Sequence, residues 1–142
     1  MAELRWQKVF CPVDFSEESR AALRVAADLA RRFGAELTLF HADAPSSALH
    51  ASAKDSAGPD RLGEWRGEAE RLGAGVVATA HAAVAPPTAI IETARSEGFD
   101  LIVMGTHGRT GRQASLIGSV AENVVRRSTV PVLTVHAEWM GR

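Results

Sequence analysis

Three glycines and a serine in the C-terminal third of the chain have the spacing of an anion-binding turn. Gly105 and Gly108 follow a buried apolar run, and Gly118 and Ser119 stand where the next helix is expected to begin. Glycine allows positive φ and close backbone approach, so main-chain N–H groups can converge on an anion without obstruction by side chains. The N–H groups and dipole of a helix N-terminus also attract phosphate. The pattern therefore indicates polyphosphate binding.

Two better-known phosphate loops are excluded by their residue requirements. A P-loop needs Gly-Lys followed by Ser or Thr, and a dinucleotide fingerprint needs its glycines after the first strand, where Asp14-Phe15-Ser16 stands instead. From these residues alone, one alternative stays open. The glycines would then only allow a tight loop and a helix start to pack, with Ser119 and Glu122 forming an ordinary capping box.

The flanking sequence predicts five strands alternating with four helices. The strands are expected at 8–13, 36–41, 76–84, 100–104 and 130–135, and the helices at 17–33, 61–72, 87–97 and 119–128. Such alternation requires parallel pairing with right-handed crossovers and helices on both faces. We predict an α/β fold over residues 1–142: a single-domain, doubly wound, five-stranded parallel sheet of Rossmann-like type. Residues 43–60, rich in Ala, Ser, Pro, Gly and Asp, are expected to form a flexible loop within that domain.

The predicted fold places the candidate residues on one rim. In doubly wound sheets, ligands bind beyond the carboxyl ends of the strands, where the strand order reverses. That rule brings Asp14, Ala42 and Gly105 to the same edge, although they are far apart in the sequence. The glycine turn and the end of the first strand are therefore expected to share a ligand.

Composition narrows the function classes. The 142 residues carry a formal net charge of -1, which gives no electrostatic reason to expect nucleic acid or anionic lipid, and no apolar run approaches the roughly 20 residues of a membrane helix. The single cysteine, Cys11, allows no intrachain disulfide, so we expect a cytoplasmic protein with Cys11 as a small buried hydrophobic residue. No spacing among the five histidines suggests a metal site, and none is predicted.

Several segments together resemble the universal stress protein family. The segments are residues 11–16, 100–111, 118–122 and 131–133. The resemblance spans essentially the whole chain, and its ATP-binding subgroup is marked by Gly, two residues, Gly, nine residues, Gly, then Ser or Thr. Gly105, Gly108, Gly118 and Ser119 match that spacing. The chain departs from the family at Ala85, where a glycine is usual, and in the polar spacer 112–115.

The resemblance implies that the cleft binds ATP, with Mg²⁺ accompanying the phosphates. Carried over to this chain, the motif residues hold the triphosphate and ribose, while Asp14 and the backbone near Val13 and Ala42 receive the nucleoside. A carboxylate there would accept hydrogen bonds from ribose hydroxyls or from the adenine amine. The residues expected to bind nucleotide are Pro12, Val13, Asp14, Ala42, Met104, Gly105, His107, Gly108, Arg109, Gly118, Ser119 and Val120.

The resemblance also implies a nucleotide-responsive signalling or protective module in stress response, dimeric through its last strand, Val132 to Val135. Two alternatives stay open: a slow ATPase or autophosphorylating enzyme, and a nucleotide-free dimer that acts by protein contact. No paired base and nucleophile is evident in the sequence, so we predict no catalytic residues and at most slow ATP hydrolysis. Asp14 has an alternative role as a turn-former or helix cap, and His107 and Arg109 as solvated loop residues.

Overall fold

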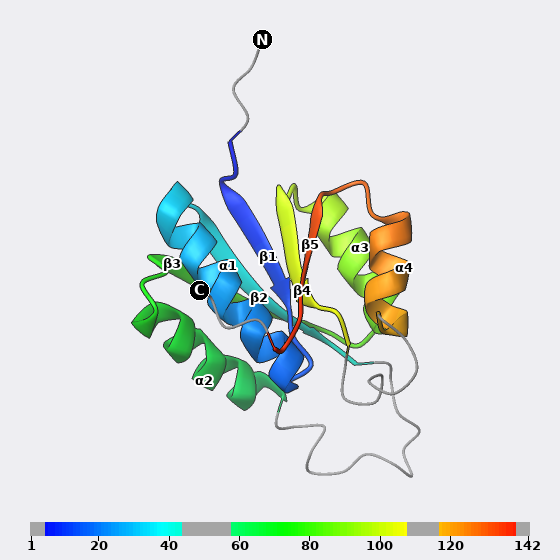
Figure 1. The fold of residues 1–142 in the computed structure, drawn as a ribbon, viewed down its shortest axis with the longest axis horizontal. Coiled ribbons are helices and arrows are strands. Elements are labelled where there is room, and N and C mark those ends of the chain that lie inside the picture. The colour runs from blue at the N-terminus through cyan, green and yellow to red at the C-terminus, as the bar shows by residue number, and fades with distance from the viewer. Residues whose placement is uncertain (1–4, 44–57, 108–116, 139–142) are drawn as a thin grey trace.

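A computed structural model of the chain describes residues 5–43, 58–107 and 117–138. Strands and helices alternate in the order β1 (Lys8–Pro12), α1 (Glu17–Phe33), β2 (Glu36–Ala42), α2 (Gly58–Arg71), β3 (Val76–Ala82), α3 (Pro86–Ser96), β4 (Leu101–Gly105), α4 (Ser119–Arg127) and β5 (Val132–Val135). Within these residues the strands form one parallel sheet with the order β3-β2-β1-β4-β5 (Figure 1). The predicted five-stranded, Rossmann-like parallel sheet is confirmed.

Two hydrophobic cores lie on opposite faces of the sheet. Helices α1 and α2 cover one face, and α3 and α4 cover the other (Figure 1). Neighbouring residues of β1 serve different cores, because successive side chains of a strand point to opposite faces. Val9 and Cys11 pack beneath α1 and α2, whereas the Phe10 ring lies 4.5 Å from that of Phe99 on the α3–α4 face. The central strand is thus buried on both sides.

The ends of α1 follow the sequence signals. The Ser16 side chain accepts a hydrogen bond from the Ser19 N–H at 3.2 Å, which satisfies one of the first-turn donors. At the other end, Gly34 adopts a left-handed conformation with φ 62°, and its N–H donates to the Ala30 carbonyl. Both ends of α1 are therefore capped by residues next to the helix in the sequence.

Helix α2 begins earlier than the sequence predicted. Gly58, Pro59 and Asp60 were placed in the flexible loop 43–60, but they form the first residues of α2, and residues 44–57 lie outside the described part of the chain. Proline is tolerated in the first helical turn, because the N–H that it lacks would have no acceptor within the helix. The prediction was therefore wrong at the C-terminal end of that segment.

Helix α3 begins at Pro86, one residue before its predicted start. Ala85, the residue before it, is the position where the resemblance led us to expect glycine, and it has φ -54° and ψ 133°. These angles lie near the extended region that a residue before proline favours, so alanine introduces no backbone strain there. No described helix is both long and apolar enough to cross a bilayer.

Candidate ligand-binding site

A cleft lies where the strand order reverses. β1 is flanked by β2 on one side and by β4 on the other, and the crossovers from these strands run to opposite faces of the sheet. Between their carboxyl ends and the first turns of α3 and α4 is a cavity of about 350 Å³. This volume lies within the usual range for small-molecule sites, and the position is the one expected for a doubly wound sheet.

The cleft brings together ten of the twelve residues predicted for the site. They are Pro12, Val13, Asp14, Ala42, Met104, Gly105, His107, Gly118, Ser119 and Val120. The other two predicted residues, Gly108 and Arg109, lie outside the described residues. Geometry therefore supports a common site, and the role of each residue toward a ligand stays a prediction.

Asp14 has a structural role as well as a place in the cleft. Its Oδ1 accepts hydrogen bonds from the Ser16 N–H and the Ser19 hydroxyl, both at 3.0 Å. This is the turn-forming role that the sequence left open for it. Because the side chain also lines the cleft, the turn holds a carboxyl group at the mouth of the sheet.

The backbone of Val13 is already engaged by neighbouring residues. Its N–H donates to the Phe40 carbonyl at 2.7 Å, and its carbonyl oxygen accepts from the His41 ring at 2.8 Å. A ligand would therefore compete for the Val13 N–H and could use only the second lone pair of its carbonyl. The Val13 backbone therefore offers a nucleoside fewer free hydrogen-bonding groups than the sequence prediction assumed.

Phe15, beside Asp14, has φ 66°. Among the described residues other than glycine, it alone has a positive φ. A bulky residue rarely takes this conformation, so its surroundings must compensate for the strain. Its ring packs against His41, with centroids 4.7 Å apart, and edge-on against Trp65 at 5.3 Å, while the Arg61 guanidinium lies 4.3 Å from its centroid. These contacts fix the direction in which the chain leaves β1.

Gly105 is required by the packing of α1. A Cβ atom at this position would lie 2.8 Å from the Glu18 Cβ and 2.9 Å from the Glu18 carbonyl carbon. Real Cβ atoms do not approach so closely, and the nearby atoms belong to helix backbone that cannot move alone. For this glycine, the packing alternative raised from the sequence therefore applies, whatever its role toward a ligand.

The start of α4 differs from the capping box considered above. Gly118 is the N-cap and supplies no side-chain hydrogen bond, while Ser119 is the first helical residue, so the capping-box alternative was wrong. The Gly118 N–H donates to the Thr106 carbonyl at 2.5 Å, which joins the end of β4 to the start of α4. The first-turn residues Ser119, Val120 and Ala121 line the cleft, and their N–H groups have no acceptor within the helix.

Glu18 is a positioning residue that sequence reasoning missed. Its side chain is buried, and Oε2 accepts hydrogen bonds from the Thr106 hydroxyl and the Ala137 N–H, both at 3.0 Å. By its position Glu18 is an acidic residue in the first turn of α1, where the helix dipole favours a negative charge. Its partners lie 88 and 119 positions away, so no local signal pointed to them.

Other residues that line the cleft were not predicted from the sequence. They are Ser19, Phe40, His41, Asp43, Pro86, Ile90 and Ala121.

The fold and the cleft together define a class of protein. It is a doubly wound α/β domain with carboxyl groups on one side of its cleft and a glycine-capped helix N-terminus on the other. Such a cleft offers hydrogen-bond acceptors at one end, donors at the other and apolar side chains such as Met104 and Ile90 between them. A ligand with an anionic group and a flat, partly apolar body matches that distribution.

Comparison with known proteins places the chain within this class. The model of the universal stress protein family matches residues 5–136. Universal stress protein MJ0531 of Methanocaldococcus jannaschii is 32% identical over 140 residues, which cover 92% of this chain and 82% of that protein. This chain belongs to the universal stress protein family.

Solved structures agree with that assignment. The structure of MJ0577 of Methanocaldococcus jannaschii aligns with a TM-score of 0.83 and 28% identity, covering 96% of this chain and 100% of that one. A universal stress protein solved in complex with cAMP aligns with a TM-score of 0.79 and 30% identity, covering 95% and 100%. The fold predicted from the alternation of strands and helices is that of solved family members.

Proposed function

We propose that this chain binds ATP in the cleft and acts as a nucleotide-responsive signalling or protective module in stress response. The observation that carries the proposal is the juxtaposition of Asp14 with the glycine-capped start of α4 across one cleft. The relative solved with cAMP supports an adenine nucleotide as the ligand class. The motif spacing of Gly105, Gly108, Gly118 and Ser119 supports a triphosphate.

The phosphate end of the proposed site is the first turn of α4. With glycine at the N-cap, no side-chain oxygen of that residue competes for the N–H groups of Ser119, Val120 and Ala121. The helix dipole adds to the attraction for negative oxygen atoms. Each charge-assisted hydrogen bond contributes about 1.5–3 kcal/mol, so three of them with a bound nucleoside are enough for roughly micromolar affinity. Mg²⁺ would accompany the phosphates as part of the ligand.

The nucleoside end is Asp14. Its carboxylate would accept from ribose hydroxyls or the adenine amine while it repels the phosphates toward α4. Asp14→Asn separates this role from the structural one, because an asparagine Oδ1 can still accept from Ser16 and Ser19. We expect Asp14→Asn to weaken the binding of ATP and of adenosine alike, with little change in the melting temperature of the ligand-free protein.

The phosphate end is tested by Ser119→Asp. A carboxylate at the first position of α4 favours the helix but repels phosphate, so calorimetry should show ATP affinity falling by about tenfold, or ~1.4 kcal/mol, and adenosine affinity unchanged. Asn123→Asp is the matched control. It adds the same charge to the same helix, at an exposed position that does not line the cleft. Equal effects of the two variants on ATP would contradict the proposed site.

Turnover is measured on the same samples. Phosphate release near background from the ATP complex fits a binding module. Hydrolysis of more than about one ATP per second would show that the protein is an enzyme. Mass spectrometry of the small molecule released on denaturation identifies the nucleotide. Protein that neither copurifies with nucleotide nor is stabilised by added ATP would favour the nucleotide-free alternative.

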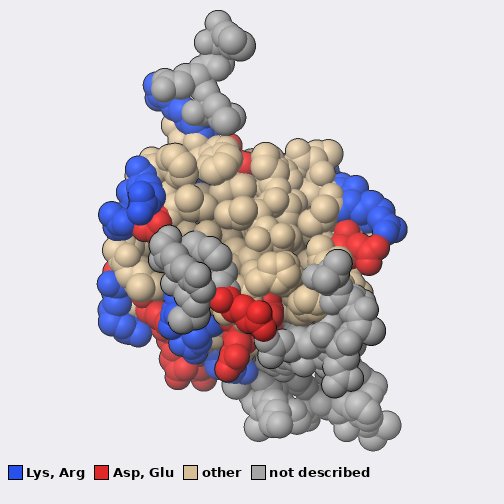
Figure 2. Space-filling view, in the orientation of Figure 1, with Lys and Arg blue, Asp and Glu red and all other residues tan. Residues whose placement is uncertain are grey.

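The proposal includes a homodimer formed through β5. β5 is an edge strand, and Leu133 on it is 39% exposed. Figure 2 shows an uncharged surface over the upper part of β5, with acidic side chains near its lower end and basic side chains toward the margins of this face. An exposed edge with apolar side chains and few charges is a surface on which a second copy can add its own strand.

A further inference from the structure

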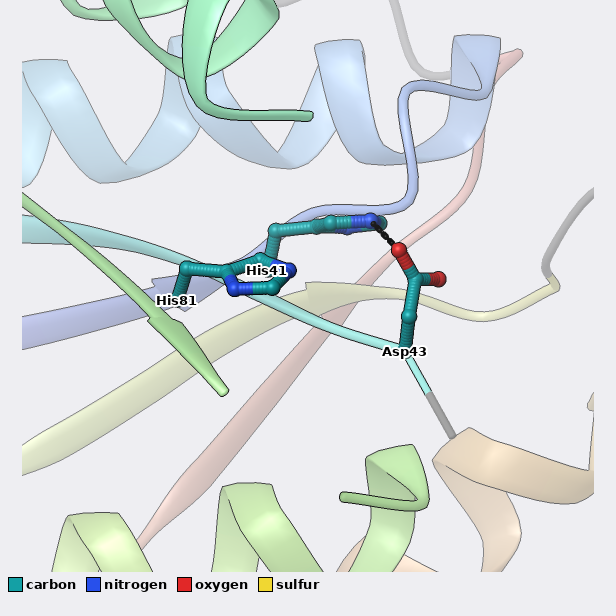
Figure 3. A group of neighbouring side chains, drawn as sticks. All are labelled: His41, Asp43 and His81. Carbon is teal, nitrogen blue, oxygen red and sulfur yellow. Dashed lines mark hydrogen bonds and ion pairs between the residues drawn. The ribbon is translucent and has the colours of Figure 1, made fainter. Parts of the chain in front are cut away.

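Two histidines and an aspartate meet at the ends of β2 and β3. His41 and His81 are register partners on these parallel strands, and Asp43 follows β2 directly. One ligand atom from each of the three residues lies within 4.8 Å of the others, with the Asp43 carboxylate turned toward the His41 ring (Figure 3). The three side chains thus bring two imidazoles and a carboxylate to one point.

Each of the two ring nitrogens of His41 lies next to an oxygen atom. Nδ1 lies 2.8 Å from the Val13 carbonyl oxygen, which can only accept, so Nδ1 carries a proton. In the neutral ring Nε2 is then an acceptor, yet it faces the Asp43 Oδ2 at 2.7 Å. A contact this short is a hydrogen bond with one proton between the two atoms, and a metal ion that replaced that proton would move the two atoms apart.

We propose that His41 Nε2, a His81 ring nitrogen and the Asp43 carboxylate bind a divalent transition-metal ion of the Zn²⁺ type. Two imidazole nitrogens and one carboxylate oxygen form a donor set that suits Zn²⁺ and leaves a fourth position open. The bond from Nδ1 to the Val13 carbonyl is the outer contact that orients metal-bound histidines and fixes their tautomer. This inference goes beyond the proposed function, because binding of the ion requires no nucleotide.

To hold an ion, the three ligand atoms, now within 4.8 Å of one another, would have to reach a common spacing, with His41 Nε2 and Asp43 Oδ2 moving apart from 2.7 Å. Ligand atoms around tetrahedral Zn²⁺ lie roughly 3.3 Å apart, as follows from bond lengths of about 2.0–2.2 Å. His41 is the fixed member: it is buried, bonded to Val13, and packed between the rings of Phe15 and His81. The Asp43 side chain is 51% exposed and His81 is also exposed, so both can rotate to close the coordination shell.

The open coordination position would lie beside the ligand cleft. His41 and Asp43 line the cleft, whereas His81 lies at its outer side on the edge strand β3. A metal ion here would place a positive charge beside the ligand cleft, next to the end of β2. The expectation that the chain has no metal site rested on sequence spacing, which does not reveal neighbours on adjacent strands.

The test uses metal alone with the full-length, chelator-treated and tag-free chain. Titration with Co²⁺ should produce visible d–d absorption that Zn²⁺ abolishes, and calorimetry should show one Zn²⁺ ion per chain. His81→Ala and Asp43→Asn should each weaken Zn²⁺ binding by more than about tenfold, the low end for the loss of even an outer-shell partner. Both residues are exposed, so the variants are expected to fold, which circular dichroism checks.

His136→Ala is the matched control, since it removes an exposed imidazole outside the group, and it should leave Zn²⁺ affinity unchanged. Absence of the Co²⁺ absorption, or Zn²⁺ binding that His81→Ala and Asp43→Asn do not weaken, would overturn the site. His41 and Asp43 would then be only a hydrogen-bonded pair. Because no nucleotide is present in these titrations, a failure of ATP binding would leave the metal result standing, and the reverse also holds.

Discussion

At the scale of single residues, Cys11 illustrates how burial alone changes chemistry. The side chain has no exposed surface in the centre of β1, and this burial raises the pKa of the thiol from 9.0 to about 12. The thiolate is the reactive form, so a thiol with this pKa is almost entirely unreactive at neutral pH. The sequence prediction that Cys11 is a small buried hydrophobic residue is confirmed.

Cys11 makes a testable contribution to pH dependence. The folded-state pKa exceeds the unfolded value, so the unfolded chain loses the thiol proton first and stability falls as pH rises from about 9 toward 12. The fall attributable to this group is about 1.4 kcal/mol per pH unit. Denaturant unfolding of the parent and of Cys11→Ala at several alkaline pH values should show the parent losing stability more steeply. Parallel curves for the two proteins would contradict this assignment.

At the scale of elements, α1 packs closely against β4 at Gly105. Gly105→Ala would force a methyl group against the Glu18 backbone, and overpacking of this kind costs about 1–3 kcal/mol. The free energy of unfolding, measured in urea, should fall by that amount. A fall below ~0.5 kcal/mol would mean that α1 can move away from the strand more easily than its buried contacts indicate.

Gly63→Ala provides the matched control for that measurement. Gly63 lies inside α2, and a Cβ atom there would meet nothing within 4 Å. Alanine in a helix interior is more stable than glycine by about 0.5–1 kcal/mol. The same substitution should therefore stabilise the protein at Gly63 and destabilise it at Gly105.

At the scale of the whole molecule, the β5 edge is the proposed dimer interface. Leu133→Lys would place a charge within that interface, and an uncompensated buried charge costs several kcal/mol. Sedimentation equilibrium should show the dimer dissociation constant rising by at least about a hundredfold. Val76→Lys is the control, because Val76 is an exposed apolar residue on the opposite edge strand, β3. A parent that sediments as a monomer, or equal loss in both variants, would exclude this interface.

The sequence by itself determined the alternation of strands and helices. Buried strands such as 101–104 are continuous apolar runs, and the helix ends at Ser16 and Gly34 carry local capping signals. These signals depend on neighbouring residues, so they can be read without knowledge of the fold. The motif from Gly105 to Ser119 is also a local signal, because it is defined by the spacing of residues in the sequence.

Only the tertiary structure decided which residues meet. Glu18 reaches Thr106 and Ala137, and His41 faces His81, because parallel strands bring distant segments together at one edge of the sheet. The strand order and register set those meetings, and neither is encoded by any local spacing. The spacing of the glycines and of Ser119 can therefore be recognised along the chain, while the packing of α1 on Gly105 and the histidine pair beside the cleft arise only once the sheet has formed.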